Sequence, residues 1–258
     1  MKQVSILDAN PETISLYGVC GYKNSKTPGF NEKIGWLKER YKEGLKTKII
    51  YSEEHGSQGM IEYLPGEHCW RPVEATGYMF IHCLFVGFKK EYKGRGFATQ
   101  LVEACEKDAR DQKKYGVAVV TRKGPFMVDN MLFIKRGYEV ADRAGSDFEL
   151  LVKKFNDKAP MPKFRNNQHL LSDKYADGLI LIRADQCPYT VKNINEIREA
   201  AAKEFGLKPR IITWQSAAEA QGSPVIFGTF GLLYNGRVIA EHPISKTRFV
   251  NIMKTLIG

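Results

Sequence analysis

A strand, a basic glycine turn and an amphipathic helix follow one another in the middle of the chain and constrain its fold most. The run Tyr78–Val86 is apolar except for His82, which is typical of a strand covered on both faces. The turn Lys93–Gly96 follows it. From Ala98 to Ala109 apolar residues recur at helical spacing. With the strand signals after this helix, the order predicts an α/β fold for the first half of the chain.

The basic glycine turn has the chemistry of an anion site. A helix start offers unpaired backbone N–H groups and the positive end of the helix dipole. Gly94 and Gly96 let the backbone approach a bulky anion, and Lys93 and Arg95 add positive charge. Two interpretations fit this pattern: a pyrophosphate cradle, or a turn whose basic residues face water. A dinucleotide fingerprint is excluded because Thr99 stands where the third glycine is needed.

The second half of the chain also alternates strands with helices. Leu179–Arg183 predicts a strand that leads through Cys187-Pro188-Tyr189-Thr190 into a helix. Val225–Thr229 predicts a further strand, and Asn235-Gly236 is the strongest short-range hairpin signal in the chain. The segment 156–176 is poor in apolar residues and contains two prolines, so we expect a linker there.

Length and composition limit the classes of protein to consider. The 258 residues fit two compact domains, which we expect at 1–155 and 177–258. No apolar run approaches the roughly 18 residues of a membrane helix, and the N-terminus lacks the apolar core of a signal peptide. The five cysteines are scattered without CxxC pairs, which argues against a disulfide framework or a metal site and for a reducing cytoplasm.

The net charge of the chain says less about its binding partners. The formal net charge of +10 suggests an anionic partner or a solvated basic surface. We expect neither nucleic acid nor a membrane as partner, because the sequence has no zinc finger, no RNA-binding aromatic motif and no concentrated basic helix. A homodimer is compatible with the sequence.

The elements around the glycine turn resemble the GNAT superfamily of acyl-CoA N-acyltransferases. That family has [Arg/Gln]-x-x-Gly-x-[Gly/Ala] between a strand and a helix. Lys93, Gly96 and Ala98 occupy the three positions, with Lys in place of Arg or Gln. The stretch Phe133–Glu139 is similar to a later family motif that ends in Gly-aromatic. The resemblance covers about residues 1–155 and implies a mixed sheet with splayed central strands.

The resemblance also implies an activity, namely direct transfer of an acetyl group from acetyl-CoA to an amine without an acyl-enzyme. Acetyl-CoA, the cosubstrate, is expected between the strands 79–88 and 116–122, with its pyrophosphate on the turn. The implied cofactor-binding residues are Phe85, Val86, Lys93, Gly94, Arg95, Gly96, Phe97, Ala98 and Thr99.

The transfer needs a base for the acceptor ammonium. His82 is the first candidate, because an imidazole with a pKa near 6.5 suits base work at neutral pH; a buried structural histidine is the alternative. Glu67, in the loop Gly66–Arg71, is the second; that loop is either a substrate wall or an ordinary exposed connection. In a regular strand Cys83 would point away from His82. Phe133 stands where the family usually has a Tyr that serves as the general acid, so no residue is assigned to protonate the leaving thiolate.

The second half resembles a thioredoxin-like fold, and its Cys187-Pro188-Tyr189 sequence is close to the active-site sequence of glutaredoxins. The resemblance implies a thiol site at Cys187 and a cis-proline at Pro224 facing it. Thr190 replaces the second cysteine, so no internal disulfide can form, but a helix N-terminus would still depress the Cys187 pKa. The tandem is similar to bacterial acetyltransferases with a YoaP-like C-terminal domain.

Three functions remain open at the level of sequence. The first is the N-acetyltransferase with a thioredoxin-like accessory domain. The second is a thiol-redox or thiol-binding protein centred on Cys187, and the third is a non-catalytic acyl-CoA-binding protein. The sequence does not identify the acceptor.

Overall fold

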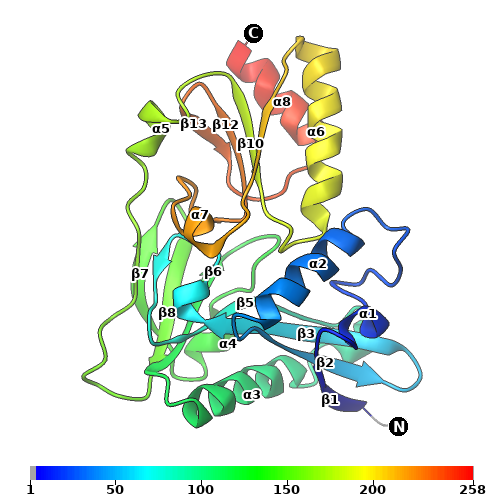
Figure 1. Cartoon of the computed structure of the whole chain (residues 1–258), viewed down its shortest axis with the longest axis vertical. Helices are drawn as coiled ribbons and strands as arrows, with labels where there is room; N and C mark the ends of the chain where they lie inside the picture. Colours follow the sequence, from blue (N-terminus) through cyan, green and yellow to red (C-terminus); the bar gives the residue numbers. More distant parts are fainter. Residues whose placement is uncertain (1–3, 258) are drawn as a thin grey trace.

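The computed structural model describes residues 4–257, which form two main sheets with helices on their faces (Figure 1). The larger sheet has seven strands in the order β1-β2-β3-β5-β6-β8-β7. These strands span Val4–Ala9 (β1), Lys46–Ser52 (β2), Gly56–Pro65 (β3), Met79–Val86 (β5), Gly116–Arg122 (β6), Glu139–Ala144 (β7) and Phe148–Lys154 (β8).

The middle of this sheet is the part that matters for function. All neighbouring strands are antiparallel except β5 and β6, which are parallel. Their pairing joins only Met79–Ile81 to Val117–Val119. Beyond Ile81, β5 pairs only with β3, and beyond Val119, β6 pairs only with β8. The mixed sheet with splayed central strands predicted from the sequence is therefore confirmed.

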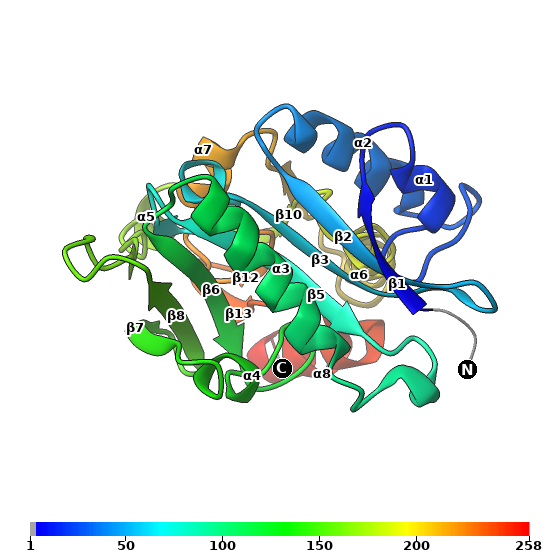
Figure 2. The ribbon, with the colours of Figure 1, turned by 90° about the horizontal axis from the view of Figure 1, so that it is seen from below.

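Helices cover both faces of the large sheet. The helix α3 (Phe97–Asp111) lies along one face (Figure 2) and buries a stripe of small and branched side chains. The helix α2 (Phe30–Tyr41) lies on the opposite face, between the sheet and the second half of the chain (Figure 1). Two short helices are α1 (Ile14–Tyr17) and α4 (Met131–Ile134). Within residues 4–257 no helix has both the length and the apolar character needed to cross a bilayer.

The second half forms a four-stranded sheet in the order β11-β10-β12-β13. The strand β10 is parallel to β11 and antiparallel to β12. At the predicted hairpin, Asn235 and Gly236 both have positive φ, as its turn requires. The elements here span Leu179–Arg183 (β10), Tyr189–Phe205 (α6), Arg210–Thr213 (β11), Ala217–Gln221 (α7), Phe230–Tyr234 (β12), Arg237–Ala240 (β13) and Lys246–Ile257 (α8).

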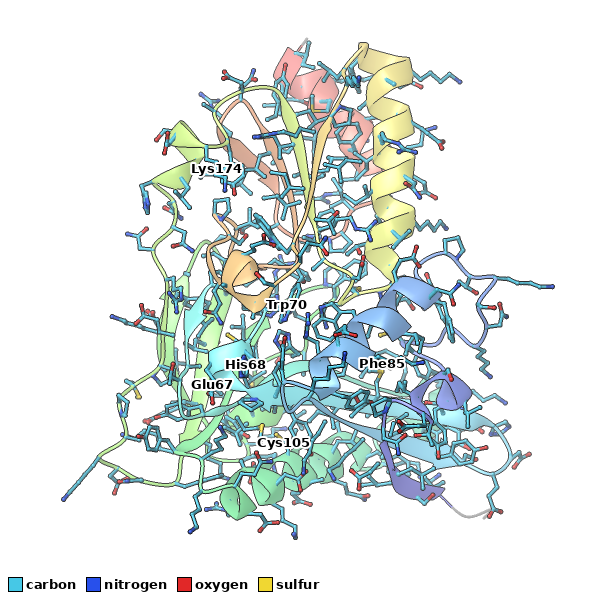
Figure 3. The ribbon with its side chains drawn as sticks, in the orientation of Figure 1. Glu67, His68, Trp70, Phe85, Cys105 and Lys174 are labelled. Carbon is cyan, nitrogen blue, oxygen red and sulfur yellow. The ribbon has the colours of Figure 1, made fainter. Side chains whose placement is uncertain are left out.

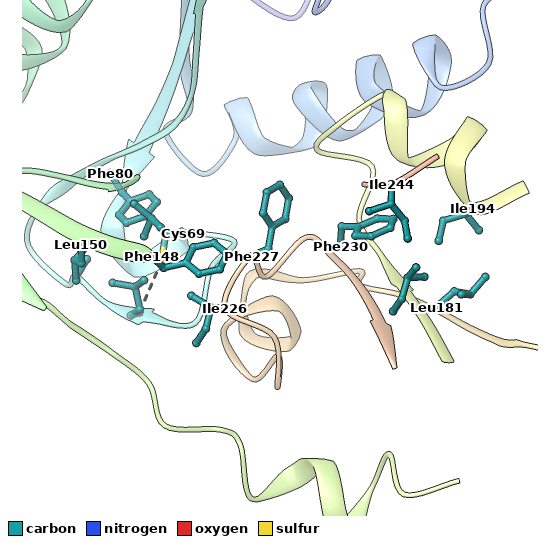
Figure 4. Packing of buried hydrophobic residues seen from close by; sticks show 14 of the residues in the cluster. Cys69, Phe80, Phe148, Leu150, Leu181, Ile194, Ile226, Phe227, Phe230 and Ile244 are labelled. Atoms are coloured by element: carbon teal, nitrogen blue, oxygen red, sulfur yellow. Dashed lines mark hydrogen bonds between the residues drawn. The ribbon is translucent and has the colours of Figure 1, made fainter. Parts of the chain in front are cut away.

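The two halves share their hydrophobic cores. One core joins Phe80 and Phe148 of the first half to Phe230 and Ile194 of the second (Figure 4). Another joins side chains of α2 to those of β10. The segment between the halves is also structured: its strand β9 (Lys163–Phe164) pairs with β4 (Val73–Glu74), and it contains the helix α5 (Leu170–Asp173).

The stretch Val225–Thr229 is not a strand, contrary to the sequence prediction. It forms a tight turn in which the N–H of Gly228 donates to the carbonyl of Val225. Gly228 has a φ of +76°, and a Cβ there would lie 2.7 Å from the carbonyl oxygen of Trp70. The apolar run is thus buried against the first half of the chain rather than within a sheet.

Candidate active site

The turn before α3 has the geometry of an anion site. Gly94 and Gly96 have φ values of +70° and +77°, and no atom lies within 4 Å of where a Cβ would be at either. Gly96 is the N-cap of α3, and no side chain caps this helix. The turn and the first residues of α3 line a cavity of about 470 Å³, whose wall is formed by residues 92–99 together with the end of β5 and with Met127, Val128 and Leu132. We call this the 93–99 cavity.

A second cavity, of about 460 Å³, lies where β5 and β6 diverge. We call it the β5–β6 cavity. Its wall includes Ile81 to Phe85 of β5 and Val119 and Val120 of β6. Leu84, Phe85, Met127 and Val128 line both cavities, so the two spaces adjoin along the end of β5.

A β-bulge in β5 directs two polar side chains into the β5–β6 cavity. Glu62 of β3 pairs with Cys83 and Tyr63 with Ile81, which leaves His82 as the extra residue. Consequently His82 and Cys83 both line the cavity. The expectation that Cys83 points to the opposite face was wrong, because it assumed a regular strand.

The environment of His82 does not suit a general base. Its Nε2 accepts a hydrogen bond from the backbone N–H of Trp70 at 2.9 Å. Burial, with the positive charges of Arg71 and Lys33, holds its pKa well below 6.5. The neutral ring therefore carries its proton on Nδ1, a buried atom with no hydrogen-bond partner among the described residues. His82 lines the cavity as a residue, but this donor atom is itself buried within the wall.

Arg71 is a buried cation on the same cavity wall, with an exposed fraction of 3%. Its Nη1 donates to the carbonyl of Phe227, and the guanidinium carbon lies 4.7 Å from the centre of the Phe227 ring. Burial lowers the Arg71 pKa to about 10, so it stays charged at neutral pH. No carboxylate pairs with Arg71 within the part of the chain that the structure describes.

Three cysteines far apart in the sequence meet at the β5–β6 cavity: Cys20, Cys83 and Cys187. The neighbouring thiol of Cys83 and burial raise the Cys20 pKa well above its ordinary value. Within residues 4–257 no group of His, Cys, Asp and Glu side chains has the arrangement of a metal site.

The turn of residues 187–190 brings the second half of the chain to the cavity. Cys187 and Tyr189 line it, and the Tyr189 hydroxyl donates to the carbonyl of Cys20 at 2.9 Å. Thr190 is buried, and its hydroxyl lies 2.7 Å from the carbonyl oxygen of Cys187. The side chain of Thr190 therefore stabilises the turn rather than facing the cavity.

The chemistry predicted for Cys187 is wrong in one respect. Burial raises its pKa to about 11, which outweighs the lowering by the backbone N–H of Tyr189. Cys187 is therefore a neutral thiol near pH 7, not the thiolate expected at a helix N-terminus. Pro224 lines a different cavity from Cys187, and no peptide bond within residues 4–257 is cis. The expected cis-proline opposite Cys187 is thus absent from the described chain.

Glu67 lies away from the β5–β6 cavity, and Figure 3 shows it well separated from Phe85. It forms an ion pair with Lys114 at 3.2 Å. Although partial burial raises its pKa, hydrogen bonds to backbone N–H groups and the charge of Lys114 lower it more. Because this carboxylate lies outside the cavity and has a lowered pKa, it does not suit the role of general base for an amine bound there. Phe133 does line the cavity, fully buried and without a proton to donate.

Sequence reasoning missed Cys20, Arg71 as an individual residue, and Tyr189. Arg71 was part of the loop proposed as a substrate wall, and it alone of Gly66–Arg71 lines the cavity. Cys20 lies in an irregular segment with no local signal. The contact of the 187–190 turn with the first half depends on tertiary packing that no spacing reveals.

Comparisons with known proteins agree with this architecture. The model of the acetyltransferase (GNAT) family matches residues 11–124, and that of the YoaP-like family matches residues 210–251. The uncharacterized N-acetyltransferase YoaP of Bacillus subtilis (strain 168) is 33% identical over 229 residues, which are 88% of each chain.

Solved structures of acetyltransferases are more distant. The GNAT family N-acetyltransferase YhbS of Escherichia coli, in complex with CoA, is 14% identical, with a TM-score of 0.41 over 64% of this chain and 92% of that one. A GNAT family acetyltransferase of Brucella melitensis, in complex with acetyl-CoA, is 11% identical, with a TM-score of 0.39 over 62% and 94%. On the strength of the family match and the Bacillus relative, the chain belongs to the GNAT family of acetyltransferases and carries a YoaP-like segment in its second half.

Proposed function

We propose that this acetyltransferase uses acetyl-CoA and transfers the acetyl group directly to an amine held in the β5–β6 cavity. The observation that carries the proposal is the pair of adjoining cavities, one at an uncapped helix start and one between the splayed strands. Bound acetyl-CoA would supply an acetyl thioester. The relatives described as acetyltransferases support the same activity.

The residues of the chain would divide the work between the two cavities. The backbone N–H groups at 96–99, with Lys93 and Arg95, would hold the pyrophosphate, and the open space over Gly94 and Gly96 would admit it. The backbone of Phe85 and Val86 at the free end of β5 would bind the pantetheine arm. In the transfer the acceptor nitrogen bonds to the acetyl carbon, the C–S bond breaks, and the proton lost by the nitrogen passes to the CoA sulfur or to water.

His82 has a different role in this proposal from the one expected from the sequence. Because Nε2 accepts the Trp70 N–H and the His82 pKa is held well below 6.5, the ring would stay neutral and fix the 66–71 loop beside β5 rather than remove a proton from the amine. The acceptor amine would then lose its proton to solvent.

We further propose that the second half has a thioredoxin-like arrangement that serves as the outer wall of the acceptor site. Its strand order β11-β10-β12-β13, with one parallel and two antiparallel pairs, supports this assignment. The raised pKa of Cys187 and the Thr at position 190 do not favour an independent redox activity. Free thiols at all five cysteines fit a reducing compartment such as the cytoplasm.

Calorimetry tests the proposed function directly. Acetyl-CoA titrated into the purified chain should bind with one site per chain, and CoA release in the presence of amines should report transfer. Absence of binding at millimolar acetyl-CoA would overturn the proposal. Binding without transfer to any of a broad amine panel would instead favour a non-catalytic acyl-CoA-binding protein.

A further inference from the structure

The β5–β6 cavity contains a positive charge that the protein itself does not balance. Arg71 is almost fully buried, and its hydrogen bond goes to a neutral backbone carbonyl of Phe227. Buried charges are costly unless an opposite charge or several hydrogen bonds compensate them. Lys33 and Glu62, the neighbouring buried ion pair, neutralise each other at 2.6 Å. The charge of Arg71 thus remains available to a ligand.

The wall around Arg71 also lacks the groups that would attract a simple cation. No Asp or Glu is among the described residues that line the β5–β6 cavity. A polyamine or a lysine side chain would meet a repelling guanidinium there and no compensating carboxylate.

From this arrangement we infer that the acetyl acceptor is an amine that also carries a carboxylate, which Arg71 binds. The guanidinium supplies charge and paired N–H donors that match a carboxylate. This inference rests on the proposed function, because it concerns the second substrate of the same reaction. It adds the class of that substrate, which the family membership does not give.

The rest of the cavity wall indicates the remainder of the acceptor. Apart from Arg71 and His82 it is built of aromatic and aliphatic side chains, of Met127 and of three cysteines, Cys20, Cys83 and Cys187. Such a wall favours an apolar or thioether side chain over a charged one. The structure therefore points to a free amino acid with an apolar or thioether side chain, bound between the two halves of the chain.

Matched pairs of acceptors that differ only in the carboxylate test this inference. L-methionine is compared with 3-(methylthio)propylamine, L-leucine with 3-methylbutylamine, and L-phenylalanine with 2-phenylethylamine. Charge-assisted hydrogen bonds favour kcat/KM for the amino acid of each accepted pair by about 10- to 100-fold. Equal or better acetylation of the decarboxylated amines overturns the inference and leaves the proposed function standing.

Variants of Arg71 connect the preference to this residue. Arg71→Gln removes the charge but keeps an amide donor for the Phe227 carbonyl. In this variant the ratio of kcat/KM for the amino acid to kcat/KM for its decarboxylated amine should fall to about 1. Arg71→Lys keeps the charge and should retain part of the preference. Arg165→Gln is the matched control, because Arg165 also bridges the halves, through Val73 and Gln221, but does not line the cavity. A preference that survives Arg71→Gln overturns the inference.

A measurement without catalysis covers the case in which Arg71→Gln does not fold. The wild-type chain is heated with L-methionine or with L-methioninamide, in the absence of acetyl-CoA. An increase in the melting temperature with L-methionine but not with L-methioninamide supports the inference. Equal changes in the melting temperature with the two compounds overturn it. If acetyl-CoA binds in the calorimeter but no amino acid of the pairs is acetylated, the inference fails while the proposed function stands. If acetyl-CoA does not bind, both fail.

Discussion

Among single residues, His82 shows how burial sets a protonation state. Its pKa is well below 6.5 in the folded chain because of burial and the charges of Arg71 and Lys33. The unfolded chain binds a proton at this position near pH 6.5, whereas the folded chain does not, so stability falls as the pH drops below 6.5. We predict a loss of up to about 1.4 kcal/mol per pH unit from this residue between pH 6.5 and 5. Denaturant unfolding at several pH values measures it.

Substitution isolates this contribution. His82→Gln keeps an acceptor for the Trp70 N–H but cannot be protonated, so its unfolding free energy should depend less on pH than that of the wild-type chain. His169→Gln, which replaces an exposed histidine, is the control and should follow the wild type. A His82→Gln curve parallel to the wild-type curve down to pH 5 would contradict the prediction.

The thiol of Cys187 gives a second prediction for a single residue. Burial raises its pKa to about 11, so its rate of alkylation by iodoacetamide should rise steadily from pH 7 to pH 10. Mass spectrometry of the peptide that contains Cys187 measures the rate separately from those of Cys20 and Cys83. The denatured chain, whose thiols have a pKa of about 8.5, is the reference. A plateau in the folded chain below pH 9 would favour a thiolate instead.

Sequence identified His82 as a polar residue in the strand beside the cosubstrate, but it could not give the proton's position. The tautomer depends on the backbone N–H of Trp70, which reaches His82 only because β5 folds beside the 66–71 loop. Likewise the helix N-terminus before Cys187 was visible, whereas the burial that dominates its pKa was not. Residue types can be read from the sequence, whereas protonation states depend on tertiary packing, which the sequence pattern does not reveal.

At the scale of elements, the glycine turn and the helix α3 that follows it were predicted correctly because their sequence signals are local, whereas binding of an anion there stays a prediction. Two glycines, two basic residues and a helix start are all contained within a few positions. The periodicity of apolar residues likewise predicted the strands and long helices of both halves. It failed at Val225–Thr229, where an apolar run is buried by packing against Trp70 rather than by a sheet. The hydrophobic pattern indicates that a segment is buried, but it does not distinguish burial within a sheet from burial against another loop.

The start of α3 provides a prediction for this element. Gly96→Glu should raise the Kd for acetyl-CoA at least tenfold, because the new carboxylate would fill the open space over the turn and repel a pyrophosphate by about 1–4 kcal/mol. Gly206→Glu is a matched control. Gly206 also has a positive φ, of +64°, and open space around it, but it ends α6 away from both cavities. Calorimetry compares the two variants, and equal losses of affinity would assign the effect to backbone strain.

The whole molecule is held together across the boundary expected at 156–176. Both large cores contain side chains from each half, and Gln186 of the second half reaches the buried Glu62 of the first at 3.4 Å. The contact of Gln186 with Glu62 joins residues 124 positions apart, so the sequence pattern did not reveal it. The contacts between the halves explain why the β5–β6 cavity has a wall from each half.

Gly29 tests the contact between the halves. It has a φ of +92° at the start of α2, and a Cβ there would lie 2.1 Å from the carbonyl oxygen of Pro188 in the 187–190 turn. Gly29→Ala must therefore displace that turn, and overpacking of this kind costs about 1–3 kcal/mol. Gly56→Ala, at a φ of +69° with no atom within 4 Å of the new Cβ, carries only the backbone strain.

We predict that Gly29→Ala lowers the unfolding free energy by about 1–3 kcal/mol more than Gly56→Ala does. It should also raise the alkylation rate of Cys187, because displacement of the turn opens the cavity wall to reagent. Denaturant unfolding and peptide mass spectrometry measure the two effects. If both variants lose the same stability and Cys187 reacts at the wild-type rate in each, the turn is not held by this contact and the halves are coupled through their cores alone.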